Sequence, residues 1–229
     1  MKTINVLNAY SSLGGNRYKW DEAAEEANVK INVTAVELDA ELAELYQERF
    51  PNDTVIVTDA HNFILNNIQK FNYCWSSPPC PSHSRARFAR RETTTPIYPD
   101  LKLYEEIIFL QHYFKGKFCI ENVIPYYEPL IPGKKRGRHL YWTNYNLPNV
   151  LSKRFTAIGS NKEQQKTKIL NHEFKNLCQF HDYDFTKYKG SQRLDKIARN
   201  LVDYEAGKTI FQTALGIHKQ QNANQKSLF

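Results

Sequence analysis

The stretch 71–84 reads FNYCWSSPPCPSHS, and the rest of the chain can be interpreted around it. Its first residues are rich in aromatic side chains, which predicts a short buried strand that ends where the prolines begin. Prolines at three positions fix the backbone φ angle on both sides of Cys80 and hold its thiol on a stiff turn. Open α/β sheets bind ligands beyond the carboxyl ends of their strands, so Cys80 is a candidate nucleophile. The alternative, a small buried core cysteine, is disfavoured by the polar residues of this loop.

Positive charge is concentrated just after Cys80. Residues 82–98 are polar and bounded by prolines, so we expect a mobile loop without regular structure. A nearby cation lowers the pKa of a thiol and stabilises the thiolate, and arginines suit nucleic-acid phosphates. The basic side chains concerned are His83, Arg85, Arg87, Arg90 and Arg91.

Composition limits the possible classes of protein. The chain has 229 residues, of which 41% are hydrophobic, and this is enough for one main domain. Its net charge of +7 favours a polyanionic partner, although a solvated basic face is the common alternative. The four cysteines contain no Cys-x-x-Cys pair, and no segment has the pattern of a signal peptide or a membrane span. We therefore expect a soluble, cytoplasmic monomer without a metal site.

The amino-terminal part of the chain predicts a nucleotide-type site. Residues 4–7 form an apolar run typical of a parallel strand, 8–16 contain a Gly-Gly turn, and 18–27 carry acidic residues suited to a helix start. Glycines let the backbone approach a ligand, and a helix amino terminus offers free N–H groups. A second strand is predicted over 33–37. Glu37 at its end has the position that binds a ribose diol in such sites, the alternative being a surface acid.

Helices and strands continue to alternate along the chain. Apolar residues at helical spacing predict helices over 39–50, 64–70, 101–114 and 206–215. Further strands are predicted over 54–58, 118–123 and 140–144. The first of these strands leads into Asp59 and the second contains Glu121, so several polar side chains are expected to converge at one edge of the sheet.

Two segments resemble, in the family's order, the catalytic motifs of the DNA cytosine-5 methyltransferases. Pro79-Cys80, with Ser84 downstream, is similar to the Pro-Cys loop, and 121–123 is similar to the Glu-Asn-Val motif. The resemblance implies that Cys80 attacks carbon 6 of cytosine so that carbon 5 can take a methyl group. It also implies that Glu121 contacts ring nitrogen 3 and the amino group, because the attack builds negative charge into the ring. The alternative for Glu121 is a capping acid at a strand end.

The basic cluster 134–139 precedes the strand predicted over 140–144. It is similar to the family's Arg-x-Arg motif, in which one arginine supports the cytosine carbonyl. Arg138 is the first candidate for this role because the strand begins beside it, and Arg136 is the second. The alternative is a solvated, phosphate-binding patch.

The resemblance implies S-adenosyl-L-methionine as methyl donor and S-adenosyl-L-homocysteine as product. Residues 10–15 are similar to the first motif, although Ser12 stands where the family usually has glycine. Asp59 would bind the adenine amino group, and Asn200 and Val202 match the last motif. The implied cofactor-binding residues are Tyr10, Ser11, Leu13, Gly14, Gly15, Glu37, Leu38, Asp59, Ala60, Asn200 and Val202.

The resemblance also implies double-stranded DNA as the partner and extrusion of one cytosine from the duplex. The loop after Cys80 would close over this nucleotide. The implied DNA-binding residues are Ser84, Arg85, Arg87, Arg90 and Arg91.

The implied fold is a Rossmann-like α/β methyltransferase, with a mostly parallel sheet, flanking helices and a small recognition lobe. We predict a catalytic core over 1–145 and a small target-recognition segment over 146–189. Residues 190–217 would return to the core, and 218–229 would form a flexible tail.

Other functions remain open at this point. One is RNA cytosine methylation on the same scaffold, since the recognition segment is short, and another is a catalytically silent DNA-binding relative. A thiol enzyme of protease type is disfavoured, because no histidine is tied to Cys80 by a pattern. The family would place the protein in a bacterium or a phage-infected cell, in restriction-modification or in phage self-protection.

Overall fold

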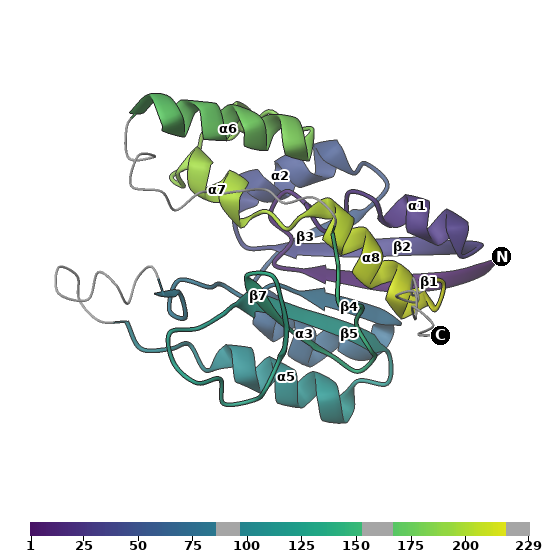
Figure 1. Ribbon diagram of the computed structural model, residues 1–229. Helices are drawn as coiled ribbons and strands as arrows, with labels where there is room; N and C mark the ends of the chain where they lie inside the picture. The colour runs from purple at the N-terminus through teal and green to yellow at the C-terminus, as the bar shows by residue number, and fades with distance from the viewer. Residues whose placement is uncertain (86–96, 153–166, 219–229) are drawn as a thin grey trace, which may run out of the picture.

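A seven-stranded sheet forms the centre of the computed structural model, which describes residues 1–85, 97–152 and 167–218 (Figure 1). The strand order across the sheet is β3-β2-β1-β4-β5-β7-β6. The strands are β1 (Lys2–Ala9), β2 (Val29–Glu37), β3 (Thr54–Val57), β4 (Tyr73–Ser76), β5 (Lys117–Val123), β6 (Lys134–Arg136) and β7 (His139–Thr143).

The first five strands pair in parallel, and β7 runs antiparallel between β5 and β6. The register places Leu7 of β1 beside Cys74 of β4, and Cys74 beside Phe118 of β5. These three residues are fully buried, as expected for central strands with helices on both faces. The parallel strands therefore direct their carboxyl ends to one edge of the sheet.

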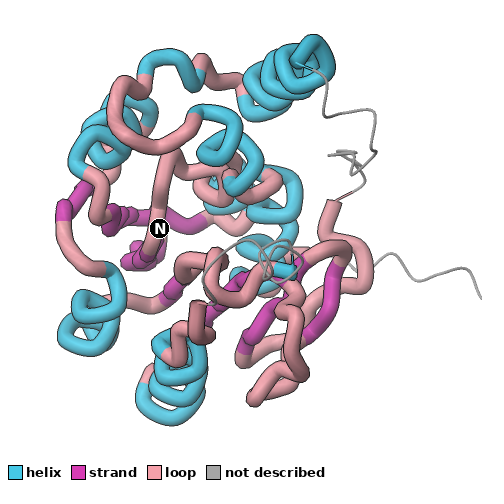
Figure 2. The backbone as a smooth tube through the Cα atoms, turned by 90° about the vertical axis from the view of Figure 1, so that its left-hand side faces the viewer, coloured by secondary structure: helices cyan, strands magenta, loops and turns pink. Residues whose placement is uncertain are grey.

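Helices cover both faces of the sheet, as the end-on view in Figure 2 shows. The helices are α1 (Trp20–Glu26), α2 (Ala40–Arg49), α3 (Ala60–Asn67), α5 (Lys102–Tyr113), α6 (Thr167–His181), α7 (Leu194–Asn200) and α8 (Tyr204–Leu215), with short 3₁₀ turns η1 (Ile68–Lys70) and η3 (Phe185–Lys187). None of the helices in the described ranges is both long and apolar enough to span a membrane.

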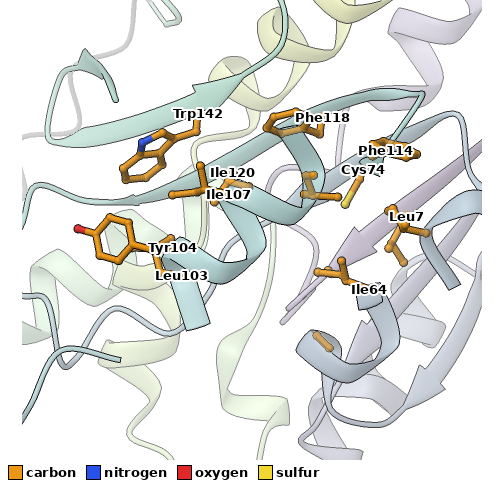
Figure 3. Close-up of a cluster of buried hydrophobic side chains, with 14 of the residues drawn as sticks. Leu7, Ile64, Cys74, Leu103, Tyr104, Ile107, Phe114, Phe118, Ile120 and Trp142 are labelled. Atoms are coloured by element: carbon orange, nitrogen blue, oxygen red, sulfur yellow. The ribbon is translucent and has the colours of Figure 1, made fainter. Parts of the chain in front are cut away.

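One hydrophobic cluster joins the sheet to α3 and α5 (Figure 3). Ile64 of α3 and Ile107 of α5 are fully buried there, against sheet residues such as Phe118 and Ile120. Burial of each such side chain stabilises the fold by about 1.5–3 kcal/mol. This cluster fixes α3 and α5 beneath the strands that lead into the Cys80 loop.

A second cluster on the opposite face joins the sheet to α1 and α8. Trp20 of α1 packs against Phe211 of α8 with ring centroids 5.0 Å apart, and both contact Tyr73. Residues two apart on a strand share a face, so Trp75, Cys119 and their neighbours line this side. Side chains alternate between the two faces along each strand, so the position of a residue in its strand decides on which face of the sheet it lies.

A third cluster connects α6, η3 and α7 to α2 and to the loop after β1. Leu177 of α6 and Ile197 of α7 are buried with Leu42 of α2 and Leu13. Helix α6 and turn η3, which belong to the segment 146–189 predicted to recognise the target, thus pack against α2 and the loop after β1. The boundaries predicted over 146–189 and 190–217 remain predictions, and residues 153–166 of the first segment lie outside the described ranges.

Most of the elements expected from the sequence are present, with ends displaced by a few residues. In the described part of the chain, one strand, two α-helices and the short turn η3 were not expected. Strand β6 is formed by the basic cluster itself, and α6 and α7 occupy stretches in which no regular pattern was recognised. As an edge strand, β6 tolerates lysines, which protect an exposed edge from pairing with other chains.

Candidate active site

A cavity of about 1310 Å³ lies at the carboxyl ends of the parallel strands. It is bounded by the loops after β1, β3 and β4, by the ends of β2 and β5, and by α6 and α7. Most of the residues proposed from the sequence line it. These are Tyr10, Ser11, Gly15, Glu37, Leu38, Asp59, Ala60, Cys80, Ser84, Arg85, Glu121, Arg138, Asn200 and Val202.

The remaining proposed residues are not among those that line the cavity. Leu13 is fully buried in the cluster with α2, and a Cβ at Gly14 would collide with the rings of Tyr46 and Phe50. Arg136 donates hydrogen bonds to the carbonyl oxygens of Leu147 and Pro148, at 3.1 and 2.5 Å. Arg87, Arg90 and Arg91 lie outside the described residues.

The loop that carries Cys80 is held by main-chain contacts. The carbonyl oxygen of Cys80 accepts hydrogen bonds from the N–H groups of His83 and Ser84, at 3.0 and 3.1 Å. The side-chain amide of Asn122, at the end of β5, donates to the carbonyl oxygen of Pro78 at 3.0 Å. Asn122 therefore fixes the loop to the strand that carries Glu121, a role the sequence motif did not reveal.

Among the described residues, the pKa of the Cys80 thiol is raised, not lowered as expected from neighbouring cations. Burial raises it most and the Glu121 carboxyl group adds to this, while the positive charge of Lys196 has a smaller, opposing effect. Burial also lowers the pKa of His83 and so favours its neutral ring. Nδ1 of this ring contacts the hydroxyl of Tyr127 at 2.5 Å. Arg85 donates instead to the carbonyl oxygen of Pro125 at 3.2 Å.

Glu121 is buried at the end of β5, and its two carboxyl oxygens have different neighbours. Oε2 accepts a hydrogen bond from the hydroxyl of Ser77 at 3.0 Å, and Ser77 accepts one from the indole N–H of Trp75 at 2.8 Å. Oε1 lies 3.3 Å from Nε2 of His139. Ser77 and His139 both line the cavity, and neither was identified from the sequence.

The loop after β1 has a strained backbone. Tyr10 and Ser12 have φ angles of 56° and 45°, in the left-handed region that favours glycine. Tyr10 donates its hydroxyl proton to Glu106 at 2.5 Å, and the N–H of Ser12 donates to Glu37 at 2.8 Å. These side-chain contacts hold the conformation at the position where the family usually has glycine.

The cavity has features that suit a bound nucleoside ligand. The hydroxyl of Ser11 is buried at the cavity wall and has no partner within the described residues. A Cβ at Gly15 would lie 2.5 Å from the carbonyl oxygen of Val202, so the absence of a side chain lets the two segments meet there. An unpaired buried hydroxyl costs free energy unless a ligand or water satisfies it. The free hydroxyl of Ser11 and the close approach at Gly15 are therefore compatible with binding of S-adenosyl-L-methionine.

Glu37 accepts three main-chain hydrogen bonds, from Ser12, Leu38 and Asp39, at 2.8 to 3.0 Å. Burial raises the pKa of Glu37, while the three donors oppose this shift. Asp59 caps α3 by accepting from the N–H of Asn62 at 2.8 Å. Both carboxyl groups line the cavity from adjacent strand ends.

Helix α6 contributes cavity residues that no sequence pattern indicated. Leu177, Phe180 and His181 come from its last turns, and apolar spacing at 174, 177 and 178 was the available signal. Arg49 of α2 holds this end by donating to the carbonyl oxygens of His181 and Leu13, at 2.6 and 3.0 Å. The wall formed by α6 is thereby tied to the glycine loop.

His181 predicts an acid sensitivity of the fold. Burial, with a smaller effect of Arg49, lowers its pKa from 6.5 to about 4, and its Nδ1 has no partner among the described residues. Between pH 4 and pH 6.5 His181 binds more protons in the unfolded chain than in the folded one. The contribution of the neutral, buried His181 to the free energy of unfolding is therefore complete above pH 6.5 and is lost as the pH falls toward 4. The loss is roughly 3 kcal/mol. Urea unfolding at pH 7 and pH 4.5 should show a smaller decrease for His181→Gln than for the wild type, and equal decreases would contradict this.

In the part of the chain that the structure describes, no three His, Cys, Asp or Glu side chains are grouped as metal ligands.

Comparison with solved structures identifies the fold. The structure of the S. pombe Dnmt2 methyltransferase is similar over 93% of this chain and 98% of that one, with a TM-score of 0.53 and 11% identity. This likeness shows the fold. The predicted Rossmann-like α/β fold, a mostly parallel sheet with flanking helices, is therefore confirmed.

Two further structural neighbours match over a shorter length. They are the Entamoeba histolytica methyltransferase EhMeth and a TehB-like SAM-dependent methyltransferase from Corynebacterium glutamicum, with identities of 17% and 13% and TM-scores of 0.37 and 0.32. The matches cover 54% of this chain in both cases, and 39% and 56% of the neighbours' own lengths. No protein-family model matches the chain, and no curated protein matches it at the level of sequence.

Proposed function

We propose that this protein is a DNA cytosine-5 methyltransferase that transfers a methyl group from S-adenosyl-L-methionine to carbon 5 of an extruded cytosine. The observation that carries the proposal is that Cys80 and Glu121 line one cavity with the glycine loop and Glu37. A thiol, a carboxyl group and a nucleoside-type site are the three elements this chemistry requires. The likeness to a methyltransferase fold is consistent with it.

In the proposed reaction, Cys80 loses its proton and its thiolate forms a bond to carbon 6 of cytosine. The electrons of the ring double bond move toward nitrogen 3, which Glu121 protonates. Carbon 5 then takes the methyl group of S-adenosyl-L-methionine, and S-adenosyl-L-homocysteine leaves. Loss of the proton from carbon 5 restores the double bond and releases Cys80. Arg138, which lines the cavity, is proposed to support the cytosine carbonyl.

The residues proposed to hold the methyl donor surround the glycine loop. Glu37 would bind the ribose diol and Asp59 the adenine amino group, with Tyr10 and Ala60 beside them. Asn200 and Val202 would approach from the carboxyl-terminal side. All six residues line the same cavity, which supports the assignment.

The proposed partner is double-stranded DNA, in keeping with the net charge of +7. Ser84 and Arg85 line the cavity just after Cys80 in the chain and are proposed to contact the nucleic acid. Arg87, Arg90 and Arg91 remain sequence-based proposals. Restriction-modification and phage self-protection are the proposed roles.

The proposal is tested with oligonucleotides that carry 5-fluorocytosine, incubated with the protein and S-adenosyl-L-methionine. Fluorine cannot leave carbon 5 as a proton does, so the covalent adduct accumulates. Duplex DNA and tRNA-like hairpins would be supplied in competition, and the adduct would be located by mass spectrometry. An adduct of DNA at Cys80 is expected. An adduct formed with RNA alone would favour RNA cytosine methylation, and no adduct with either would leave a catalytically silent relative.

Replacing Glu37 by alanine is expected to weaken the binding of S-adenosyl-L-methionine by roughly 10- to 100-fold, because a hydrogen bond to a charged group contributes about 1.5–3 kcal/mol. Calorimetric titration measures the affinity. Glu44→Ala, at an exposed position of α2, is the control and should bind normally. An affinity of Glu37→Ala within twofold of the wild type would exclude Glu37 from the ribose site.

A further inference from the structure

We propose that His139 is a positioning residue that shares one proton with Glu121, and that this pair supplies the proton to nitrogen 3 of cytosine. The inference rests on the proposed function and adds a residue to its machinery. The sequence motif predicted a role for the arginines on either side of Gly137. The structure instead brings the histidine that follows them beside Glu121.

Strand register explains why His139 and Glu121 meet. In the antiparallel pair of β5 and β7, Glu121 lies opposite Tyr141, and Val123 lies opposite His139. Residues two apart on a strand project from the same face, so Glu121 and His139 share one side of the sheet. Their Oε1 and Nε2 atoms are 3.3 Å apart, and both residues line the cavity. Catalytic contacts of this length commonly shorten when substrate binds.

The contacts of the other carboxyl oxygen determine where Glu121 can carry a proton. The indole N–H of Trp75 can only donate, so the oxygen of Ser77 accepts from it at 2.8 Å. Ser77 then directs its own hydroxyl proton to Oε2 of Glu121 at 3.0 Å. Since Oε2 acts as an acceptor, the acidic proton of a neutral Glu121 is favoured on Oε1. This is the oxygen beside His139.

The other ionisable groups around the pair come from the Cys80 loop and from β5, β6 and β7 with their connecting turn. Cys80, Lys135 and Arg138 line the cavity with it, the Cys119 thiol and the Tyr141 hydroxyl are close enough to Glu121 for its charge to act on them, and Arg136 lies opposite His139 on β6. Arg136 is engaged with the carbonyl oxygens of residues 147 and 148. Within the described ranges, His139 is the one basic side chain within ion-pair distance of Glu121.

The proposed step conserves protons and electrons. When the thiolate of Cys80 adds to carbon 6, one proton moves from the His139–Glu121 pair through Oε1 to nitrogen 3. When carbon 5 takes the methyl group, the bond between nitrogen 3 and this proton breaks, and the proton returns to the pair. The pair is therefore unchanged over a turnover.

The test compares His139→Gln and His139→Leu with the wild type. Glutamine keeps an N–H donor near the Nε2 position but cannot titrate, and leucine removes the donor. Both variants are expected to lower kcat by at least roughly tenfold at pH 8 with unchanged affinity for S-adenosyl-L-methionine. In His139→Gln the alkaline decline of kcat should begin at lower pH, because Glu121 alone then holds the proton for nitrogen 3. His112→Gln, at an exposed position of α5, is the matched control.

A second measurement does not depend on methyl transfer. The Nε2 resonance of His139, followed by NMR with labelled histidine, should shift in Glu121→Gln, because the contact with the carboxylate Oε1 is lost. A wild-type pH profile in His139→Gln would overturn the shared proton in catalysis. An unchanged Nε2 resonance of His139 in Glu121→Gln would overturn the pair itself. Absence of methyl transfer in the wild type would instead contradict the proposed function, and the NMR result would still decide whether the pair exists.

Discussion

Cys80→Ser is expected to lower methyl transfer by on the order of 10⁴-fold or more, the effect of removing a covalent nucleophile. A serine hydroxyl is a weak nucleophile unless a neighbouring base activates it. The residue is held through its main chain, by the N–H groups of His83 and Ser84 and by the Asn122–Pro78 contact. The substitution therefore leaves the loop in place, and affinity for S-adenosyl-L-methionine should remain close to that of the wild type.

Methyl incorporation from a labelled donor measures the effect, and trapping with 5-fluorocytosine measures adduct formation independently. Cys178→Ser is the control, because this partly buried cysteine of α6 is not among the residues that line the cavity. Turnover of Cys80→Ser at the wild-type level would remove Cys80 from the mechanism. Since burial and Glu121 raise the pKa of the thiol, the wild-type rate should also increase with pH on its acidic side.

Glu106→Leu is expected to lower the free energy of unfolding by about 3–5 kcal/mol, the cost of breaking a buried polar network. Glu106 is fully buried on α5 and receives three donors from different elements. They are the hydroxyl of Tyr10 at 2.5 Å, the hydroxyl of Ser76 at 2.7 Å and the Nδ1 atom of His61 at 3.0 Å. Leucine would leave these donors without an acceptor, and each unsatisfied buried group costs about 1–3 kcal/mol.

Urea unfolding of Glu106→Leu, with the midpoint and slope fitted separately, measures this loss. Glu105→Leu is a closely matched control on the same helix. Glu105 is largely exposed, and its one described contact is with Nε2 of His61 at 3.2 Å, so its loss should cost at most about 1 kcal/mol. Equal effects of the two substitutions would show that the network does not stabilise the fold. The network also joins the loop of Tyr10 to the strand end of Ser76, so cofactor affinity should fall in any folded Glu106 variant.

The parts of the fold that follow simple patterns could be predicted from the sequence. Apolar runs such as the one ending at Leu7, and helical spacing around Ile107, identified the core strands and helices. Strand β6 was missed because Lys134–Arg136 carries only charged residues, and an edge strand is held by main-chain pairing with β7. Helix α6 was missed because its apolar spacing was hidden among aromatic and charged residues, although its side chains complete a core with α2.

The sequence predicted which residues of the candidate site lie together, but it did not predict the pKa of the Cys80 thiol. Cys80, Glu121 and Glu37 could be predicted to line one cavity, because each lies at or just after the carboxyl end of a parallel strand and these ends meet at one edge of the sheet. Sequence proximity suggested that cations would surround Cys80, but burial and Glu121 determine the pKa of its thiol. His139 could not be identified from linear order, since its contact with Glu121 depends on the register of β5 and β7.

The meeting of Gly15 with Val202 has a consequence for how the protein is made. The glycine loop leaves the ribosome well before the segment that closes against it, because about 190 residues of chain separate the two. All of the described strands precede this segment and can pair while synthesis continues, but the cavity proposed to hold the methyl donor has its last wall only after Val202 has emerged. A nascent chain stalled before this residue would hold the sheet of described strands and an open cavity with low affinity for a ligand.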